Sequence, residues 1–142
     1  MSGCNIFGTV SPTKTIDLAA KDLFPFADEL KVDTSAYLTL IFNHSRVTDE
    51  EKNFLRNGVK WLNEEAILLY DMVYTKLNAT QRENTLKTIS QQNWGESWIE
   101  SILTYTMEAI FSDKIYGVNK EENAHKWLNA TMGLPRPKER LL

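Results

Sequence analysis

The stretch TDEEKNFLRNGVKWLNEEAILLYDMVYTKL, from Thr48 to Leu77, decides the fold class of this chain. Its apolar residues recur at alternating steps of four and three, the spacing of one helix face. The residues of this seam are Leu55, Val59, Leu62, Ala66, Leu69, Val73 and Leu77. Thr48 and Glu51 match the capping box that opens a helix. We therefore predict one helix about 40 Å long, at a rise of ~1.5 Å per residue, which Gly58 weakens by about 1 kcal/mol relative to alanine.

Helical spacing continues on both sides of this stretch. Asp33 is expected to cap a helix through about residue 44, and a short helix is expected to end before Pro25. Downstream, 80–91 begins with a second apparent capping box formed by Thr80 and Glu83. The segment 94–111 carries two adjoining apolar stripes, which predict a central helix contacted by several others. Because no window alternates with a period of two, we predict an all-α helical bundle with one long helix.

The two ends of the chain have a different composition. Residues 1–14 are rich in small and turn-forming residues and are expected to be a flexible N-terminal leader. Residues 15–142 are expected to form a single helical domain. Within it, 112–142 is predicted to be an extended C-terminal strap, laid over a surface rather than built into the bundle, with a short helix at 121–128. The close Gly133-Leu134-Pro135-Arg136-Pro137 supports this prediction, because proline fixes φ and removes a backbone donor.

Composition excludes several classes of protein. The chain has 142 residues, is 42% apolar and 25% charged, and carries a formal net charge of −3. This balance provides no basic footprint, so no nucleic acid is expected as a partner. No apolar run approaches the roughly 20 residues that a membrane-spanning helix needs. The single cysteine rules out an internal disulfide framework and zinc sites with several thiolates.

The position of that cysteine has its own interpretation. Met1-Ser2-Gly3-Cys4 is similar to the end of a bacterial lipoprotein signal, where small residues precede a cysteine that becomes lipidated. This interpretation makes Cys4 a lipid attachment point and requires an apolar segment upstream of Met1. The alternative is a native start followed by an incidental thiol.

Catalytic motifs are absent from the sequence. It lacks the glycine-rich dinucleotide and phosphate motifs, the nucleophile elbow and the zinc-binding H-E-x-x-H pattern. Glu122 and His125 have the Glu-x-x-His spacing of di-iron bundles, but such sites need a second pair and two further glutamates. An exposed charged face is the simpler interpretation of this pair.

Four tryptophans, at positions 61, 94, 98 and 127, are many for this length. Trp98 falls on the core stripe of its helix. Trp94 and Trp127 fall outside the strong seams, where aromatic side chains suit a protein–protein surface.

The C-terminal part resembles a known family. Ser112-Asp113-Lys114-Ile115-Tyr116-Gly117-Val118-Asn119, followed by Trp127 and the Gly133–Pro137 close, is similar to the signature of gluconate 2-dehydrogenase subunit 3 proteins. Three positions depart from that signature: Val118 replaces a glycine, Lys114 stands where proline is common, and Arg136 replaces a glycine. The order of the signature is nevertheless kept.

The resemblance implies a role in a complex. It implies a flavin-dependent large subunit of the glucose–methanol–choline (GMC) type, a cytochrome c subunit, and a small subunit that binds the flavoprotein and carries it through twin-arginine export. FAD and haem c would then belong to the partners, with no cofactor, metal or catalysis in this chain. The expected location is the periplasm, with membrane contact only through a lipid on Cys4. The partner-binding residues implied are Tyr116, Gly117, Asn119, Trp127, Gly133, Pro135 and Pro137.

Two other hypotheses stay open at this point. The first is a metal-binding helical-bundle oxidoreductase that uses Glu122 and His125. The second is a stand-alone envelope lipoprotein that binds a small ligand between its helices.

Overall fold

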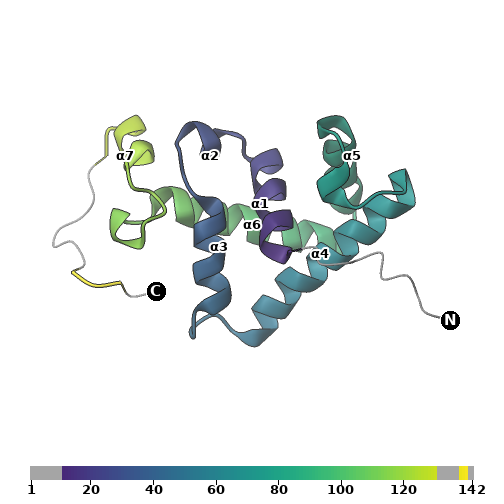
Figure 1. Cartoon of the computed structure of the whole chain (residues 1–142), viewed down its shortest axis with the longest axis horizontal. Coiled ribbons are helices and arrows are strands. Elements are labelled where there is room, and N and C mark those ends of the chain that lie inside the picture. Colours follow the sequence, from purple (N-terminus) through teal and green to yellow (C-terminus); the bar gives the residue numbers. More distant parts are fainter. Residues whose placement is uncertain (1–10, 131–137, 141–142) are drawn as a thin grey trace.

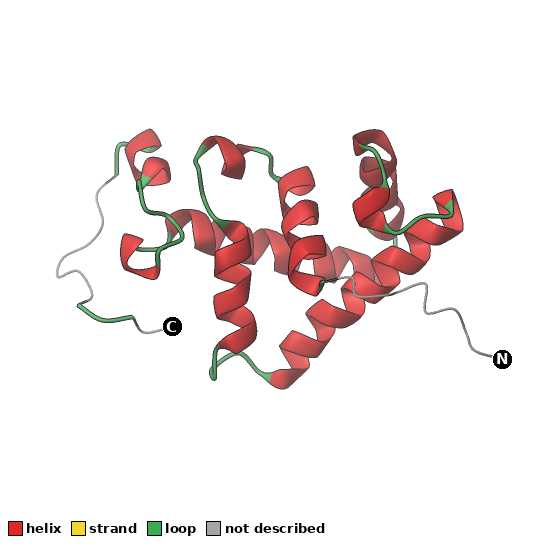
Figure 2. Cartoon of the chain, viewed as in Figure 1, coloured by secondary structure: helices red, strands yellow, loops and turns green. Residues whose placement is uncertain are grey.

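The computed structural model describes residues 11–130 and 138–140, and every regular element within them is helical (Figure 2). The all-α prediction is therefore confirmed. In chain order the elements are α1 (Pro12–Leu23), α2 (Phe26–Glu29), α3 (Thr34–Asn43), α4 (Asp49–Tyr70), η1 (Tyr74–Lys76), α5 (Ala79–Ile89), α6 (Asn93–Phe111), η2 (Lys114–Tyr116) and α7 (Asn123–Trp127).

Helix α6 occupies the centre of the fold, as its two apolar stripes predicted. It runs across the molecule and contacts α1, α3, α4, α5 and α7 (Figure 1). Its Trp98 is fully buried, and the indole N–H donates to the backbone oxygen of Leu55 on α4 at 3.2 Å. Gly58 allows this close approach, because a Cβ at that position would lie 2.0 Å from Trp98 Cδ1. The glycine that weakens α4 locally therefore makes room for the largest side chain of the core.

The long helix is shorter than its seam predicted. The Thr48–Glu51 capping box is present, but α4 ends at Tyr70, after 22 residues, and Asp71 adopts a left-handed conformation with φ 59°. Leu69, expected inside, is 39% exposed. The chain turns here because Asn63, buried within α4, accepts a hydrogen bond from the Tyr74 amide at 2.9 Å and draws that residue into the core.

Two helix starts also differ from the sequence prediction. Helix α5 begins at Ala79, and its capping box is formed by Asn78 and Gln81, so the N-cap lies two residues before the expected Thr80. Asparagine is a strong N-cap residue, and glutamine three positions later completes the reciprocal pair. Helix α1 begins at Pro12, three residues inside the expected leader, because proline is favoured in the first helical turn. Helix α1 ends before Pro25 as predicted, and the Asp33 cap of α3 is present.

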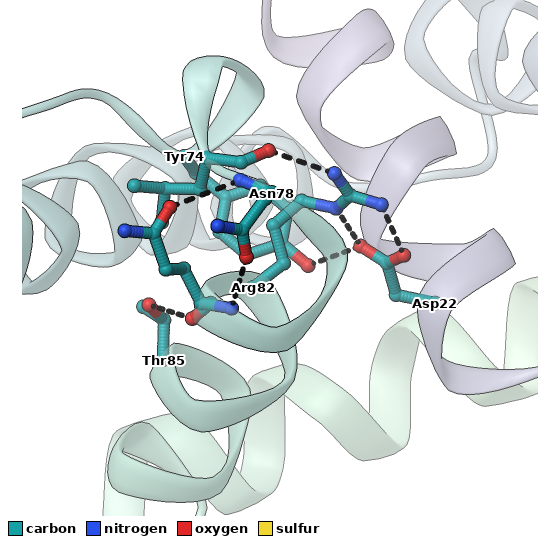
Figure 3. A network of polar contacts seen from close by, with 7 residues as sticks. Asp22, Tyr74, Asn78, Arg82 and Thr85 are labelled. Carbon is teal, nitrogen blue, oxygen red and sulfur yellow. Dashed lines mark hydrogen bonds and ion pairs between the residues drawn. The ribbon is translucent and has the colours of Figure 1, made fainter.

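A polar network ties α1 to the segment between α4 and α5 (Figure 3). Arg82 makes a bidentate pair with Asp22, with Nε to Oδ2 at 2.7 Å and Nη2 to Oδ1 at 3.0 Å. The Tyr74 hydroxyl donates to Asp22 at 2.7 Å, and Arg82 also donates to the Leu77 carbonyl at 2.9 Å. Burial and the hydrogen bond to Asp22 raise the pKa of Tyr74, so its hydroxyl stays protonated and remains a donor. The side chains of Asp22, Tyr74 and Arg82 are thus engaged in hydrogen bonds that join α1 to η1 and α5.

The segment after α6 packs more deeply than a strap. Val118 and Ala124 belong to the buried core, and α7 contacts α6. The prediction of an extended strap over 112–142 is therefore not confirmed. Within residues 112–128, Val118 and Ala124 complete the core, whereas Trp127 and Leu128 stay exposed. Within the described residues, no helix is both long and apolar enough to cross a membrane.

Candidate protein-interaction surface

The family-like signature begins by capping the end of α6. The side-chain amide of Asn119 donates to the carbonyl oxygens of Ile110 at 2.8 Å and Ser112 at 3.2 Å. These are carbonyls that the end of a helix leaves without helical partners. Gly117 ends η2 with φ 75°, a left-handed conformation that glycine adopts without steric cost. The order Gly-x-Asn is thus explained by a turn followed by a cap.

The same segment is bonded to the connection between α2 and α3. The Val118 carbonyl accepts from the Asp33 amide at 3.1 Å, and the Asn123 side chain donates to the Leu30 carbonyl at 3.0 Å. Lys31 and Glu121 form an exposed ion pair at 3.4 Å. Hydrogen bonding from Asn123, followed by the charge of Lys31, lowers the pKa of Glu121. These contacts set the position of α7 relative to α2.

Helix α7 lies between α2 and the end of α6 and leaves apolar side chains exposed on both flanks. On one flank the Trp127 ring meets Phe26 edge to face, with centroids 5.1 Å apart. On the other, His125 meets Phe111 in the same manner at 5.8 Å. Trp127 is 64% exposed, and Met107, Phe111 and Leu128 are also exposed. We call these residues with Phe26 the α7 face.

The predicted partner-binding residues occupy different positions. Trp127 is at the surface, Tyr116 is partly buried against the core, and Gly117 shapes the turn. Asn119 is 1% exposed and bonded inward, so it supports the surface rather than forming it. Gly133, Pro135, Pro137 and the proposed lipidation site Cys4 lie outside the described residues.

Other residues of the α7 face were not predicted. Phe26 and Phe111 join it only because α2, α6 and α7 meet in space. The sequence feature nearest to Phe26 is the pair Phe24 and Phe26 on either side of Pro25. A proline between two aromatic residues predicts a break in the helix and does not by itself predict a binding surface.

The metal hypothesis finds no further ligands in the described parts of the chain, where no group of three or more His, Cys, Asp or Glu side chains comes together. Glu122 precedes α7 in a left-handed conformation with φ 50°. It therefore does not share a helix face with His125 in the way that a Glu-x-x-His ligand pair requires. His125 instead packs on Phe111.

The space between the helices does not favour the small-ligand hypothesis. An internal cavity beside Ile16, Leu38 and Ile102 has a volume of only ≈ 10 Å³. A larger groove of ≈ 600 Å³ opens at the surface along α3 and α6. In it the Tyr37 hydroxyl donates to Glu108 at 2.8 Å, and burial followed by this bond raises the pKa of Tyr37. The groove thus presents a hydrogen-bonded carboxylate rather than a deep apolar pocket.

Fold and surface together define a small all-α protein in which a C-terminal signature segment builds an exposed aromatic face. The family model described as gluconate 2-dehydrogenase subunit 3 matches residues 13–130, from α1 through α7. The chain belongs to the gluconate 2-dehydrogenase subunit 3 family, as the signature indicated. Searches of curated proteins and of solved structures returned no match.

Proposed function

We propose that this chain is a non-catalytic small subunit that binds the FAD-containing large subunit of a gluconate 2-dehydrogenase-like complex. The family is that of a small subunit in such a dehydrogenase, which implies association with other subunits. The large subunit would be a GMC-type flavoprotein and would pass electrons to a cytochrome c subunit carrying haem c. The present chain would stabilise the flavoprotein and escort it during export to the periplasm, with Cys4 as a lipid anchor.

One observation carries this proposal: the 64% exposure of Trp127 on the rigid support of Phe26. An indole that is largely exposed in the isolated chain can bury a large area at little entropic cost, which is typical of a binding hot spot. The rest of the signature holds α7 in place through Asn119 and Val118. We therefore place the contact with the flavoprotein on the α7 face.

Co-expression with the cognate large subunit tests this assignment. Trp127→Ala is expected to weaken the complex by about 30-fold, which corresponds to a hot spot of roughly 2 kcal/mol. Leu69→Ala is the matched control, because Leu69 is an exposed apolar residue of α4, outside the α7 face. Affinity is measured by titrating purified wild-type and variant chains against the flavoprotein, and thermal unfolding verifies that both variants are folded.

Each outcome of that experiment has a definite meaning. Loss of binding with Trp127→Ala alone supports the α7 face. Loss with Leu69→Ala alone would place the interface on α4 instead. If the wild-type chain and the large subunit form no complex at all, the accessory-subunit role itself is wrong. Mass spectrometry of the mature N-terminus tests lipidation at Cys4 separately.

A further inference from the structure

A second aromatic surface lies at the opposite end of α6 from the α7 face. Trp94, in the first turn of α6, meets Trp61 of α4 edge to face with ring centroids 5.2 Å apart. Phe111 ends the same helix about 25 Å away, at a rise of ~1.5 Å per residue. Figure 1 shows α7 and the C-terminal half of α4 at opposite sides of the molecule. The two surfaces can therefore be occupied at the same time.

The two indoles form part of a defined hollow. It has a volume of ≈ 370 Å³ and is lined by Trp61, Glu64, Glu65, Leu68, Gln92 and Trp94. The Trp94 indole N–H donates to Gln92 at 2.7 Å, which fixes the orientation of the ring. Leu68, at 78%, is the most exposed large apolar side chain among the described residues. We call this set the tryptophan hollow.

The charge of the lining indicates what it can bind. Glu64 and Glu65 contribute two carboxylates, and among the described residues no lysine or arginine lines the hollow. Lys60 approaches Glu64 from outside at 3.9 Å, but both side chains are well exposed, so the pair is weak and open to exchange. Tryptophan is the best aromatic partner for a cation, and a neighbouring carboxylate supplies the counter-charge.

We infer that the tryptophan hollow binds an arginine side chain of a second protein partner, presented next to an apolar residue. The planar guanidinium stacks on an indole and pairs with Glu64 or Glu65, while the aliphatic stem and its apolar neighbour cover Leu68. This inference concerns the end of the molecule remote from the α7 face, and it does not depend on the proposed function.

Two other occupants fit the charges less well. A second copy of this chain, facing the first across a two-fold axis, would bring Glu64 and Glu65 of both copies together, and like charges repel. An anionic lipid surface would meet the same repulsion. A basic protein segment is attracted by the carboxylates and also buries the exposed leucine.

The test uses the full chain, labelled with ¹⁵N, and a 14-residue amphipathic peptide with leucines on one face and arginines beside them. Each tryptophan gives one indole N–H signal in the NMR spectrum. We expect the Trp61 and Trp94 signals to shift on titration, while those of buried Trp98 and of Trp127 stay in place. The matched peptide carries citrulline, which keeps the shape of arginine without its charge, and should bind about 10-fold more weakly.

Variants of the chain test the same inference from the other side. The double variant Glu64→Gln/Glu65→Gln keeps the side-chain shapes on the outer face of α4 and should weaken binding of the arginine peptide about 10-fold. Leu68→Ser should weaken binding of both peptides. Equal binding of the arginine and citrulline peptides, or shifts at Trp127 instead of Trp61 and Trp94, would overturn the inference.

Two further results would also overturn it by identifying another occupant. Concentration-dependent shifts of the Trp61 and Trp94 signals without peptide would indicate a second copy of the chain. Binding to phosphatidylglycerol vesicles through the same signals, without a response to the peptide, would indicate a membrane surface.

Discussion

Replacing Gly58 by alanine separates local helix propensity from tertiary packing, because the two predict changes of opposite sign. In an isolated helix the substitution stabilises by about 1 kcal/mol. In this fold the added Cβ would lie 2.0 Å from both Cδ1 and Nε1 of Trp98, well inside any contact that real Cβ atoms make. The indole is fully buried, and in a close-packed interior a displaced ring has to displace its neighbours as well.

The size of the effect follows from three contributions. Overpacking a well-filled core costs about 1–3 kcal/mol. Displacing the ring also strains its hydrogen bond to Leu55, which contributes about 0.5–1.5 kcal/mol. After the gain of about 1 kcal/mol in helix propensity, Gly58→Ala should lower the free energy of unfolding by about 0.5–3.5 kcal/mol.

Urea unfolding followed by circular dichroism at 222 nm measures this free energy. Asn57→Ala is the matched control, since Asn57 is the exposed neighbour on α4 and should gain stability from propensity alone, by a few tenths of a kcal/mol. In a Trp98→Leu background, which removes the indole, Gly58→Ala should be much less harmful. A Gly58→Ala protein as stable as wild type, or more stable, would refute the packing argument.

Three further perturbations test the polar contacts. Arg82→Met removes the partner of the Asp22 carboxylate, which is less than one-fifth exposed, and should lower the free energy of unfolding in urea by about 2–3 kcal/mol. Adding Asp22→Asn removes the unpaired charge and should recover part of that loss. Hydrogen bonds from the Thr48 backbone and side chain lower the pKa of Glu51 from 4.5. The stability that this carboxylate contributes is therefore present above pH 4.5, and it is lost as the pH falls through the lower pKa of the folded state. The difference in stability between wild type and Glu51→Ala should therefore shrink in that acidic range, and a constant difference from pH 6 to pH 3 would contradict the assignment. Asn119→Ala removes the side-chain donor to the Ile110 carbonyl and should lower the free energy of unfolding by about 1–3 kcal/mol. Amide hydrogen exchange should become faster mainly in residues 112–128. Unchanged exchange there would show that the cap is dispensable.

Some features of the candidate surface were accessible from sequence. Trp127 lies outside every strong apolar seam, and that alone placed it at a surface, where the structure also has it. Asn119 stands in the same signature and was assigned the same role, yet its amide is used internally to cap α6. A signature records that residues are required together and does not distinguish those that contact a partner from those that hold the backbone. Likewise, the hollow between Trp61 and Trp94 could not be predicted, because it joins residues 33 positions apart on two helices.

The sequence by itself determined the features that depend on neighbours along the chain. These are the helical period of α4 and α6, the Thr48–Glu51 capping box, the break before Pro25 and the family signature, each set by contacts within a few residues. Only the tertiary structure decided where α4 ends, because the turn after Tyr70 depends on Asn63 binding the Tyr74 amide eleven residues further on. It also decided the role of Gly58, which from the sequence is a weak point in a helix and in the fold is the space that Trp98 fills. Local propensities of about 1 kcal/mol are outweighed wherever a buried side chain or amide has to be accommodated, and those positions are set by packing between distant segments.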